Sequence, residues 1–228
     1  DTEGECADMI DFFQITGSSS FAVRAALEEG GIDYTVHNVH PRNRDLPGFE
    51  ATNPLKRVPA IRDGDTAVYE TGAILLYLVE RFPSAELGPQ PGEPGRGDLL
   101  RWIVYLANTV HDVHYPVLWP SFVCADEAGH AGVQAKGREK FAQVGEYLEA
   151  QLTGRDWCVG DRFSVADIYL YMLKGWQAYG SGTLGGAALD AHYARVGARP
   201  AIARARELDD LDLQLMRHNP NMRGGEPI

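Results

Sequence analysis

Three consecutive serines separate a predicted strand from a predicted helix near the start of the chain. Gly17 and Ser18, Ser19 and Ser20 lie between an apolar run at residues 9–15 and a run of helix formers at residues 21–29. The unpaired N–H groups and the positive dipole end of a helix N-terminus favour an anion such as a thiolate. Serine hydroxyls there could donate to the same anion, each contributing about 1.5–3 kcal/mol, or one of them could cap the helix. Both roles are compatible, because one serine can cap while its neighbour faces a ligand.

A proline precedes the predicted third strand. Pro59 cannot donate a hydrogen bond to a β-ladder, so it must stand at the start of a strand or in an unusual turn. A cis bond between Val58 and Pro59 would suit this position. It would also present the N–H and C=O groups of Val58 to a peptide-like ligand, as an added strand would.

A carboxylate and a hydroxyl flank the start of a predicted helix at residues 71–81. Side chains such as those of Glu70 and Thr71 often only compensate the helix dipole or cap the helix. The alternative is a clamp in which Glu70 binds an ammonium group, while Thr71 and backbone N–H groups bind a carboxylate. Both interpretations remain open at this point.

A group of aromatic and imidazole side chains in the second half could line a pocket for an apolar compound. Its members are Trp102, Tyr105, His111, His114, Tyr115 and Trp119, with Trp176 and Tyr179 as further possible walls. Core packing is the alternative. We expect no metal, because His111 and His114 have only Asp112 beside them and lack a third well-placed ligand.

The composition argues against several classes of partner. The chain has 21 basic and 32 acidic residues, a net charge of -11, and scattered charges, which disfavours nucleic acid. Its three cysteines form neither a CxxC pair nor a disulfide framework, which favours a reducing cytoplasm. No apolar run approaches the roughly 20 residues of a membrane span, and residues 1–8 do not resemble a signal peptide. We therefore expect no membrane partner.

The elements that position the first three features follow an α/β order. Strand, helix and strand at residues 9–15, 21–29 and 33–39 have the spacing of a βαβ unit, which predicts a parallel pair. Residues 41–54 indicate a loop with one turn of helix. Strands at residues 58–62 and 66–69 flank an Asp-Gly pair, which predicts a hairpin, and a helix follows at residues 71–81. This order predicts one mixed four-stranded sheet between helices.

The second half has a helical pattern throughout. Residues 87–97 are rich in Pro and Gly and indicate a linker, and helices are predicted at residues 98–110, 132–151, 164–179 and 200–217. We expect a leader at residues 1–8, an α/β domain at 9–84, a linker at 85–97, an all-α domain at 98–217 and a tail at 218–228.

Four separated motifs, in this order, resemble the cytosolic glutathione transferases. They are GSSSFAVRAAL, ATNPLKRVPAI, YETGAILLYL and FSVADIYL, and the resemblance extends over residues 9–217. It implies a bacterial-type member of the superfamily with beta-, theta- and zeta-like features. The implied fold is an N-terminal thioredoxin-like domain with a C-terminal helical domain. The resemblance further implies a homodimer, glutathione as cosubstrate, a role in detoxification and no other cofactor.

The resemblance also assigns site residues. The family's cis-proline falls on Pro59, beside Arg57 and Val58, whose backbone would pair with the cysteinyl part of glutathione. Its pair for the γ-glutamyl end falls on Glu70 and Thr71. For the glycyl carboxylate we choose Arg44, with His40, Arg42 and Lys56 as rivals. His111 falls where the beta class carries a histidine, and with Tyr105 and Tyr115 it is expected to line the second-substrate pocket.

The position that activates the thiol departs from the family's serine classes. Aligning AVRAAL places the beta-class cysteine, and the asparagine of some bacterial relatives, on Ser19. The serine of the theta and zeta classes falls instead on Gly17. We therefore rank Ser19 first, followed by Ser18 and Ser20. Because this turn has no cysteine, we expect ionisation of glutathione's own thiol rather than a mixed disulfide.

The resulting hypothesis is attack of a glutathione thiolate on a small electrophilic or hydrophobic substrate held by the helical domain. Alternatives are glutathione-dependent isomerisation, ether cleavage or dehalogenation at the same site, a non-catalytic binding or regulatory protein, and a thiol other than glutathione. The Ser164–Asp167 motif is expected to be a structural capping box.

Overall fold

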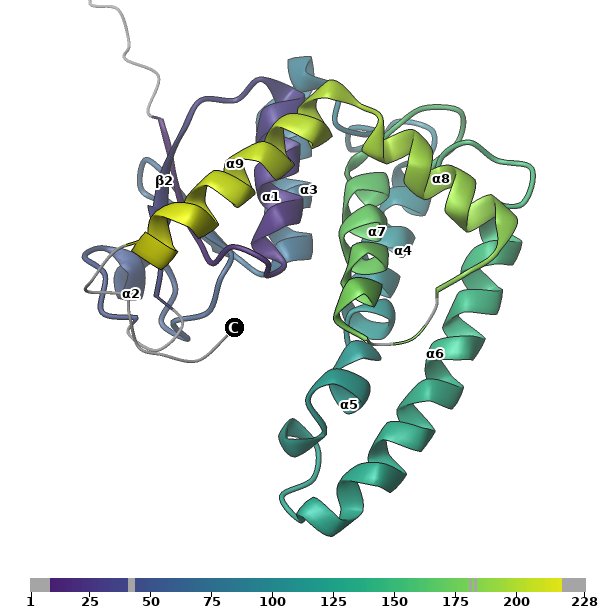
Figure 1. Ribbon diagram of the computed structural model, residues 1–228. Coiled ribbons are helices and arrows are strands. Elements are labelled where there is room, and N and C mark those ends of the chain that lie inside the picture. The colour runs from purple at the N-terminus through teal and green to yellow at the C-terminus, as the bar shows by residue number, and fades with distance from the viewer. Residues whose placement is uncertain (1–8, 41–43, 181, 183, 219–228) are drawn as a thin grey trace, which may run out of the picture.

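The computed structural model describes residues 9–40, 44–180, 182 and 184–218, with the backbone alone at 215–218 (Figure 1). The predicted leader, the predicted tail beyond His218 and the candidate Arg42 lie outside the described residues. Figure 1 shows an α/β half, which contains the N-terminal elements, beside a helical half.

The α/β half is built on one mixed sheet, as predicted. Its strands are β1 (Ile10–Gln14), β2 (Tyr34–Asn38), β3 (Ala60–Asp63) and β4 (Thr66–Tyr69), in the order β2-β1-β3-β4. β1 and β2 are parallel, and the other two pairs are antiparallel. The βαβ unit and the hairpin are both confirmed.

Three helices accompany this sheet. They are α1 (Ser20–Gly30), α2 (Phe49–Thr52) and α3 (Thr71–Arg81), and a short 3₁₀ turn, η1 (Pro83–Ala85), follows them. α1 and α3 pack against each other and bury their apolar faces in the main core, whereas α2 covers a smaller cluster around Phe13 and Phe49. The single helical turn predicted within residues 41–54 is α2.

The helical half contains six α-helices among the described residues. They are α4 (Arg96–Tyr105), α5 (His114–Leu118), α6 (His130–Leu152), α7 (Val165–Gly175), α8 (Ala187–Gly197) and α9 (Pro200–His218). Shorter turns are η2 (Leu106–Val110), η3 (Pro120–Phe122), η4 (Glu127–Gly129) and η5 (Trp176–Tyr179).

The prediction of four helices in this half missed α5 and α8. α5 is one short turn with Pro116 inside it, and α8 follows a glycine-rich stretch that reads as loop. Tertiary packing stabilises α8, because Leu189, His192 and Val196 are buried against the rest of the half. Two predicted helices also change character, since α4 continues as the π-helical turn η2 and α7 continues as the 3₁₀ turn η5.

The start of α7 carries the predicted capping box. Ser164 and Asp167 exchange hydrogen bonds, and the second oxygen of Asp167 accepts from the Cys158 N–H at 2.8 Å and from His192 Nε2 at 2.8 Å. Cys158, Asp167 and His192 thus place three buried atoms that could ligate a metal within 4.8 Å of one another. Both oxygens of Asp167 already accept hydrogen bonds. We therefore interpret the cluster as a buried hydrogen-bond network that joins α7, α8 and the loop before α7.

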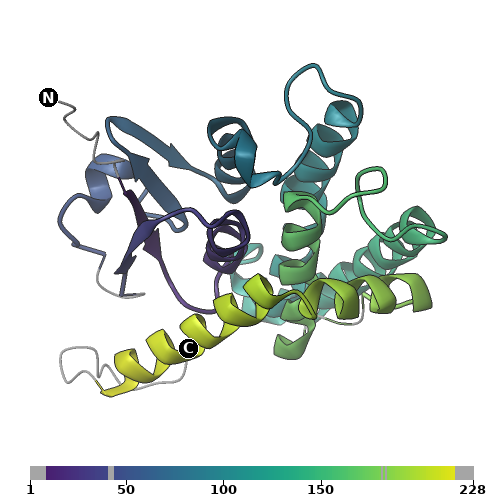
Figure 2. The ribbon, with the colours of Figure 1, turned by 90° about the horizontal axis from the view of Figure 1, so that it is seen from above.

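The last helix returns to the first half. Figures 1 and 2 both show α9 running from the helical half along α1, and α1 and α9 form an extensive helix–helix contact. None of the described helices is long and apolar enough to cross a membrane.

Candidate active site

The three chemical features of the first half meet at one end of the sheet. Phe13, Ala60 and Tyr69 are paired across β1, β3 and β4 in a single row. The turn at residues 17–20 leaves the sheet just after this row on β1, Pro59 precedes it on β3, and Glu70 follows it on β4. Because β3 is antiparallel to both neighbours, these segments lie at the same end of the sheet although they are far apart in sequence.

The three serines of the turn have different environments. The Ser18 hydroxyl donates to the Ile15 carbonyl at 2.6 Å, and the Ser20 hydroxyl accepts from the Ile15 N–H at 3.4 Å. Ser18 and Ser20 also bond to each other at 2.9 Å. Ser19 is buried and stands at the N-cap of α1, but its hydroxyl makes no hydrogen bond within the part of the chain that the structure describes. Ser19 is therefore the hydroxyl left available to a ligand.

The segment before β3 is shaped by a cis peptide bond and an asparagine. The Val58–Pro59 bond is cis. Asn53 accepts from the Leu55 N–H at 3.0 Å and donates from Nδ2 to the Arg57 carbonyl at 2.7 Å. Asn53 is buried, so this pair of bonds holds the loop up to Val58. Asn53 was not among the predicted site residues, although the Asn-Pro pair marked its loop.

Arg44 lies over the same loop. Its Nη1 donates to the Lys56 carbonyl at 2.7 Å. Lys56 forms ion pairs with Asp45 at 3.2 Å and Glu50 at 3.0 Å. Burial raises the pKa of the Tyr115 phenol, and the exposed Arg57 lies close enough to oppose part of that rise. The rival His40 is partly buried at the end of β2.

Glu70 has a backbone conformation that is rare for its residue type. It is exposed, caps α3 at φ 74° and ψ 121°, and makes no cap hydrogen bond with its side chain. A non-glycine residue at positive φ costs of order 1–3 kcal/mol and persists where the surroundings impose it, often at functional sites. Thr71, the next residue, is buried. The conformation therefore favours the clamp over simple dipole compensation.

A face of the helical half closes over Thr71. The Tyr169 hydroxyl lies 3.1 Å from Nδ1 of His111 and hydrogen-bonds with the Thr71 side chain. Burial raises the pKa of Tyr169, so this phenol stays protonated. Burial and the neighbouring His114 lower the pKa of His111 to about 4, so its imidazole is neutral at neutral pH. Thr71, Tyr169 and His111 thus form a polar chain between the halves.

A π-helical turn places His111 on this face. The His111 N–H donates to the Leu106 carbonyl at 2.8 Å, five residues back, where an α-helix would use a carbonyl four residues back. Such turns are frequent at functional sites. Tyr169 was missed from sequence because it sits within the apolar helix of the capping motif. Its polar role arises only where α7 meets η2 and α3.

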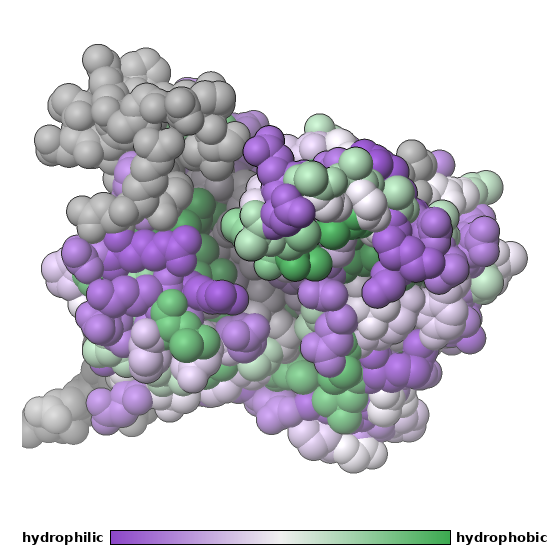
Figure 3. Space-filling view, turned by 90° about the horizontal axis from the view of Figure 1, so that it is seen from below, coloured by the Kyte–Doolittle hydropathy of each residue, from purple (hydrophilic) through white to green (hydrophobic). Residues whose placement is uncertain are grey.

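An aromatic wall extends from His111. His111 and Tyr115 are stacked with centroids 5.7 Å apart, and Trp119 lies 5.6 Å beyond Tyr115. Phe122 is stacked on Trp119 at 6.2 Å. Trp119 and Phe122 are exposed, and Figure 3 shows hydrophobic residues on both sides of a hollow between the two halves. The wall is an apolar surface whose inner member, Tyr115, lies within electrostatic reach of Glu70.

The structure brings together most, but not all, of the candidate pocket residues. His111 and Tyr115 lie on the face described above. Tyr115 is also within electrostatic reach of Glu70. Tyr105 packs instead against Tyr147 of α6 with ring centroids 4.9 Å apart. Tyr179, one of the further possible walls, is exposed, and its hydroxyl borders Gly17 of the serine turn.

Comparisons with known sequences match both halves separately. Residues 9–80 match the family "Glutathione S-transferase, N-terminal domain", and residues 107–200 match "Glutathione S-transferase, C-terminal domain". A relative, the glutathione S-transferase GstA of Escherichia coli O157:H7, is 29% identical over 168 residues, which cover 72% of this chain and 80% of the relative.

Solved structures agree with these matches. A sphingomonad glutathione S-transferase complexed with glutathione shares 31% identity at a TM-score of 0.76, covering 88% of this chain and 99% of that one. A glutathione transferase homolog from Sulfitobacter with bound glutathione shares 28% identity at a TM-score of 0.77, covering 88% and 98%. With its thioredoxin-like first domain, its helical second domain and matches over both, the chain belongs to the glutathione S-transferase family.

Proposed function

We propose that this protein binds glutathione at this end of the sheet and promotes attack of its thiolate on a small electrophile. The observation that carries the proposal is the Phe13–Ala60–Tyr69 row, which gathers the serine turn, the cis Val58–Pro59 bond and Glu70 at one end of the sheet. These three features suit a thiol, a peptide backbone and an amino-acid end respectively. The family relatives with bound glutathione support the same ligand.

In this proposal Ser19 is the catalytic residue for the thiol. Its hydroxyl would donate to the sulfur and, with the N-terminus of α1, lower the thiol pKa. Ser18 and Ser20 would instead support the turn, because their hydroxyls are engaged with Ile15 and with each other. The rest of the rate enhancement would come from holding two reactants together.

The remaining site residues would bind the ends of glutathione. The Val58 backbone would pair with the cysteinyl part, with Pro59 fixing its direction. Glu70 and Thr71 would hold the γ-glutamyl end, and Arg44 and Arg57 are the candidates for the glycyl carboxylate. No further cofactor is part of this scheme.

The electrophile would lie against the aromatic wall. His111 is neutral at neutral pH and Tyr115 carries no charge, so this side of the site suits an uncharged, apolar substrate. Tyr115→Ala would then weaken the electrophile's apparent affinity more than that of glutathione, since only the wall is changed.

We also propose a homodimer in a reducing compartment such as the cytoplasm. Leu100 and Val104 on α4 and Tyr147 on α6 are exposed, as is Tyr69 on β4, which suits the family's pairing of the first domain of one subunit with the helices of the other. Cys124 and Cys158 are free thiols among the described residues.

The test is calorimetric titration with glutathione, combined with the ultraviolet absorbance of the bound thiolate across pH. Wild type should bind and show a lowered thiol pKa. Ser19→Ala should still bind but with a higher thiol pKa and a kcat lower by about 10- to 100-fold, the value of one hydrogen bond to an anion. Ser18→Ala is the matched control. This variant is expected to lower the free energy of unfolding and to leave the thiol pKa close to the wild-type value.

Either of two results would reject this assignment. Absence of binding by the wild type would move the function to another thiol or to a non-catalytic role. Binding with an unchanged thiol pKa in Ser19→Ala would remove Ser19 from the chemistry while leaving the glutathione site in place.

A further inference from the structure

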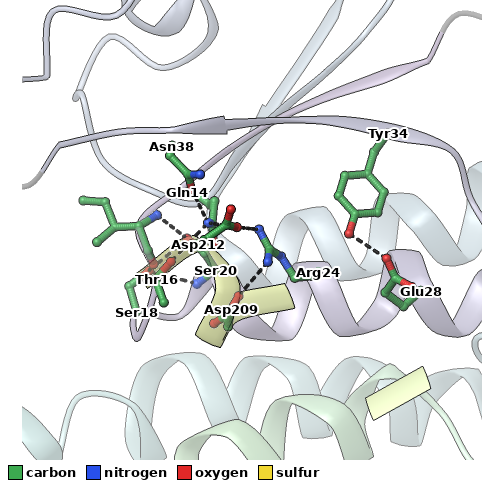
Figure 4. A network of polar contacts seen from close by, with 11 residues as sticks. Gln14, Thr16, Ser18, Ser20, Arg24, Glu28, Tyr34, Asn38, Asp209 and Asp212 are labelled. Carbon is green, nitrogen blue, oxygen red and sulfur yellow. Dashed lines mark hydrogen bonds and ion pairs between the residues drawn. The ribbon is translucent and has the colours of Figure 1, made fainter. Parts of the chain in front are cut away.

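The outer side of the serine turn is closed by charged residues from the opposite end of the chain. Arg24 on α1 is 1% exposed, and it lies between two carboxylates of α9. Its Nη1 is 3.1 Å from Asp209 Oδ1, and its Nη2 is 2.5 Å from Asp212 Oδ2 (Figure 4). A buried arginine between two carboxylates joins the helical domain to α1 at one defined register.

The network reaches the backbone of the turn and the end of the sheet. The Gly17 N–H faces the Asp209 carboxyl and favours its charged form. Gln14, the last residue of β1, donates from Nε2 to Asp212 Oδ2 at 3.2 Å and to Asn38 at the end of β2. Gly17 itself has φ 80°, a left-handed conformation that directs the chain from β1 into the turn. Asp209 therefore holds the residue that sets the path of the serines.

This arrangement is expensive for stability. Burial outweighs the attraction of Arg24 and raises the pKa of Asp209 to about 6, with Asp212 and Asp210 contributing in the same direction. Gln14 Oε1, Arg24 Nε and Asp209 Oδ1 are buried without a hydrogen-bond partner in the described part of the chain, although Asp209 Oδ1 keeps its ion pair with Arg24. Replacing a whole buried ion pair by apolar side chains of similar volume is often neutral for stability, whereas removing one partner alone leaves a buried charge with less compensation. In variants of Asp209, Arg24 keeps Asp212 as its partner.

We propose that Asp209 is a positioning residue for catalysis, which fixes the Gly17–Ser18–Ser19 backbone from behind so that the Ser19 hydroxyl meets the thiol. The inference rests on the proposed function of Ser19. It makes the C-terminal helix a part of the active site, although α9 supplies no group that touches the substrate.

Two substitutions of Asp209 distinguish its role as an acceptor for the backbone from a contribution to packing. Asp209→Asn retains an oxygen that can accept from the Gly17 N–H, whereas Asp209→Leu retains the volume but loses the acceptor. Asp210→Asn, on the exposed neighbour in the same helix, is the matched control for loss of one negative charge.

Steady-state kinetics and the pKa of the bound thiol are measured for all four proteins. We expect Asp209→Leu to lower kcat about tenfold and to raise the thiol pKa by about one unit, with KM for glutathione within twofold, because the peptide is held elsewhere. Asp209→Asn and Asp210→Asn should remain within twofold of the wild-type kcat. Equal kcat and thiol pKa in Asp209→Leu and wild type would overturn the proposal, as would equal losses in the Leu and Asn variants.

A second measurement needs no destabilised variant and no glutathione. In the wild type, the Gly17 amide resonance should titrate with a midpoint near the pKa of about 6 of Asp209, and in Asp210→Asn the same transition should remain at a lower pH. In Asp209→Asn this transition should vanish. A Gly17 amide that does not titrate in the wild type would overturn the positioning contact, whereas failure of the wild type to bind glutathione would overturn the proposed function alone.

Discussion

Glu70 combines an unfavourable backbone conformation with a proposed binding role. At φ 74° the residue pays a conformational cost that glycine would avoid. We expect Glu70→Gly to raise the free energy of unfolding by about 1 kcal/mol while abolishing retention on immobilised glutathione. Glu70→Ala is the control, since it loses the carboxylate but keeps the strain. Chemical denaturation of both variants checks this, and an equal gain of stability in Glu70→Ala would contradict the strain argument.

The low pKa of His111 predicts how the stability of the protein depends on pH. The unfolded chain binds this proton below pH 6.5 and the folded protein only below about 4, so its contribution to stability is complete above 6.5 and is lost as the pH falls toward 4. His111→Asn should therefore remove a part of the acid destabilisation worth about 3 kcal/mol at pH 4. Unfolding measured from pH 4 to 8 tests this. Parallel curves for both proteins over the whole range would show that His111 does not titrate so low.

At the scale of elements, the start of α7 depends on one carboxylate. Asp167 accepts from Ser164, from the Cys158 N–H and from His192, all buried. Asp167→Ala should lower the free energy of unfolding by about 3 kcal/mol or more, since it leaves several buried donors unsatisfied. Glutathione affinity of the remaining folded protein, measured well below the melting temperature, should be unchanged. A loss of affinity without loss of stability would assign this cluster to the binding site instead.

At the scale of the whole molecule, the exposed face of α4 and α6 tests the proposed dimer. Val104 is 54% exposed, and Leu100 on the same helix and Tyr147 on α6 are exposed as well. A charge there would be buried in a dimer interface, so Val104→Glu should shift the sedimentation coefficient from dimer to monomer at micromolar concentration. Leu211→Glu, on an equally exposed position of α9, should leave the assembly unchanged. A monomeric wild type would reject the dimer without affecting the site of the single chain.

The sequence by itself determined the elements whose signals are local. The βαβ spacing, the Asp-Gly hairpin and the 71–81 helix are found as predicted, since alternation, turn residues and helical periodicity act over a few positions. The capping box is likewise local and is found as predicted. α8 escaped prediction because its stability comes from burial against other helices, which no short window contains.

The folded structure decided how the serines differ, through the local path of the turn, and what lies around them, through tertiary packing. Ser18, Ser19 and Ser20 are the same residue type. Ser18 and Ser20 are engaged by the carbonyl and the N–H of Ile15, whereas Ser19 is not. Tyr169 and Asp209 acquire their roles from partners tens or hundreds of residues away. Such contacts depend on how whole elements pack, because a hydrogen bond is set by distance and angle in space rather than by separation along the chain.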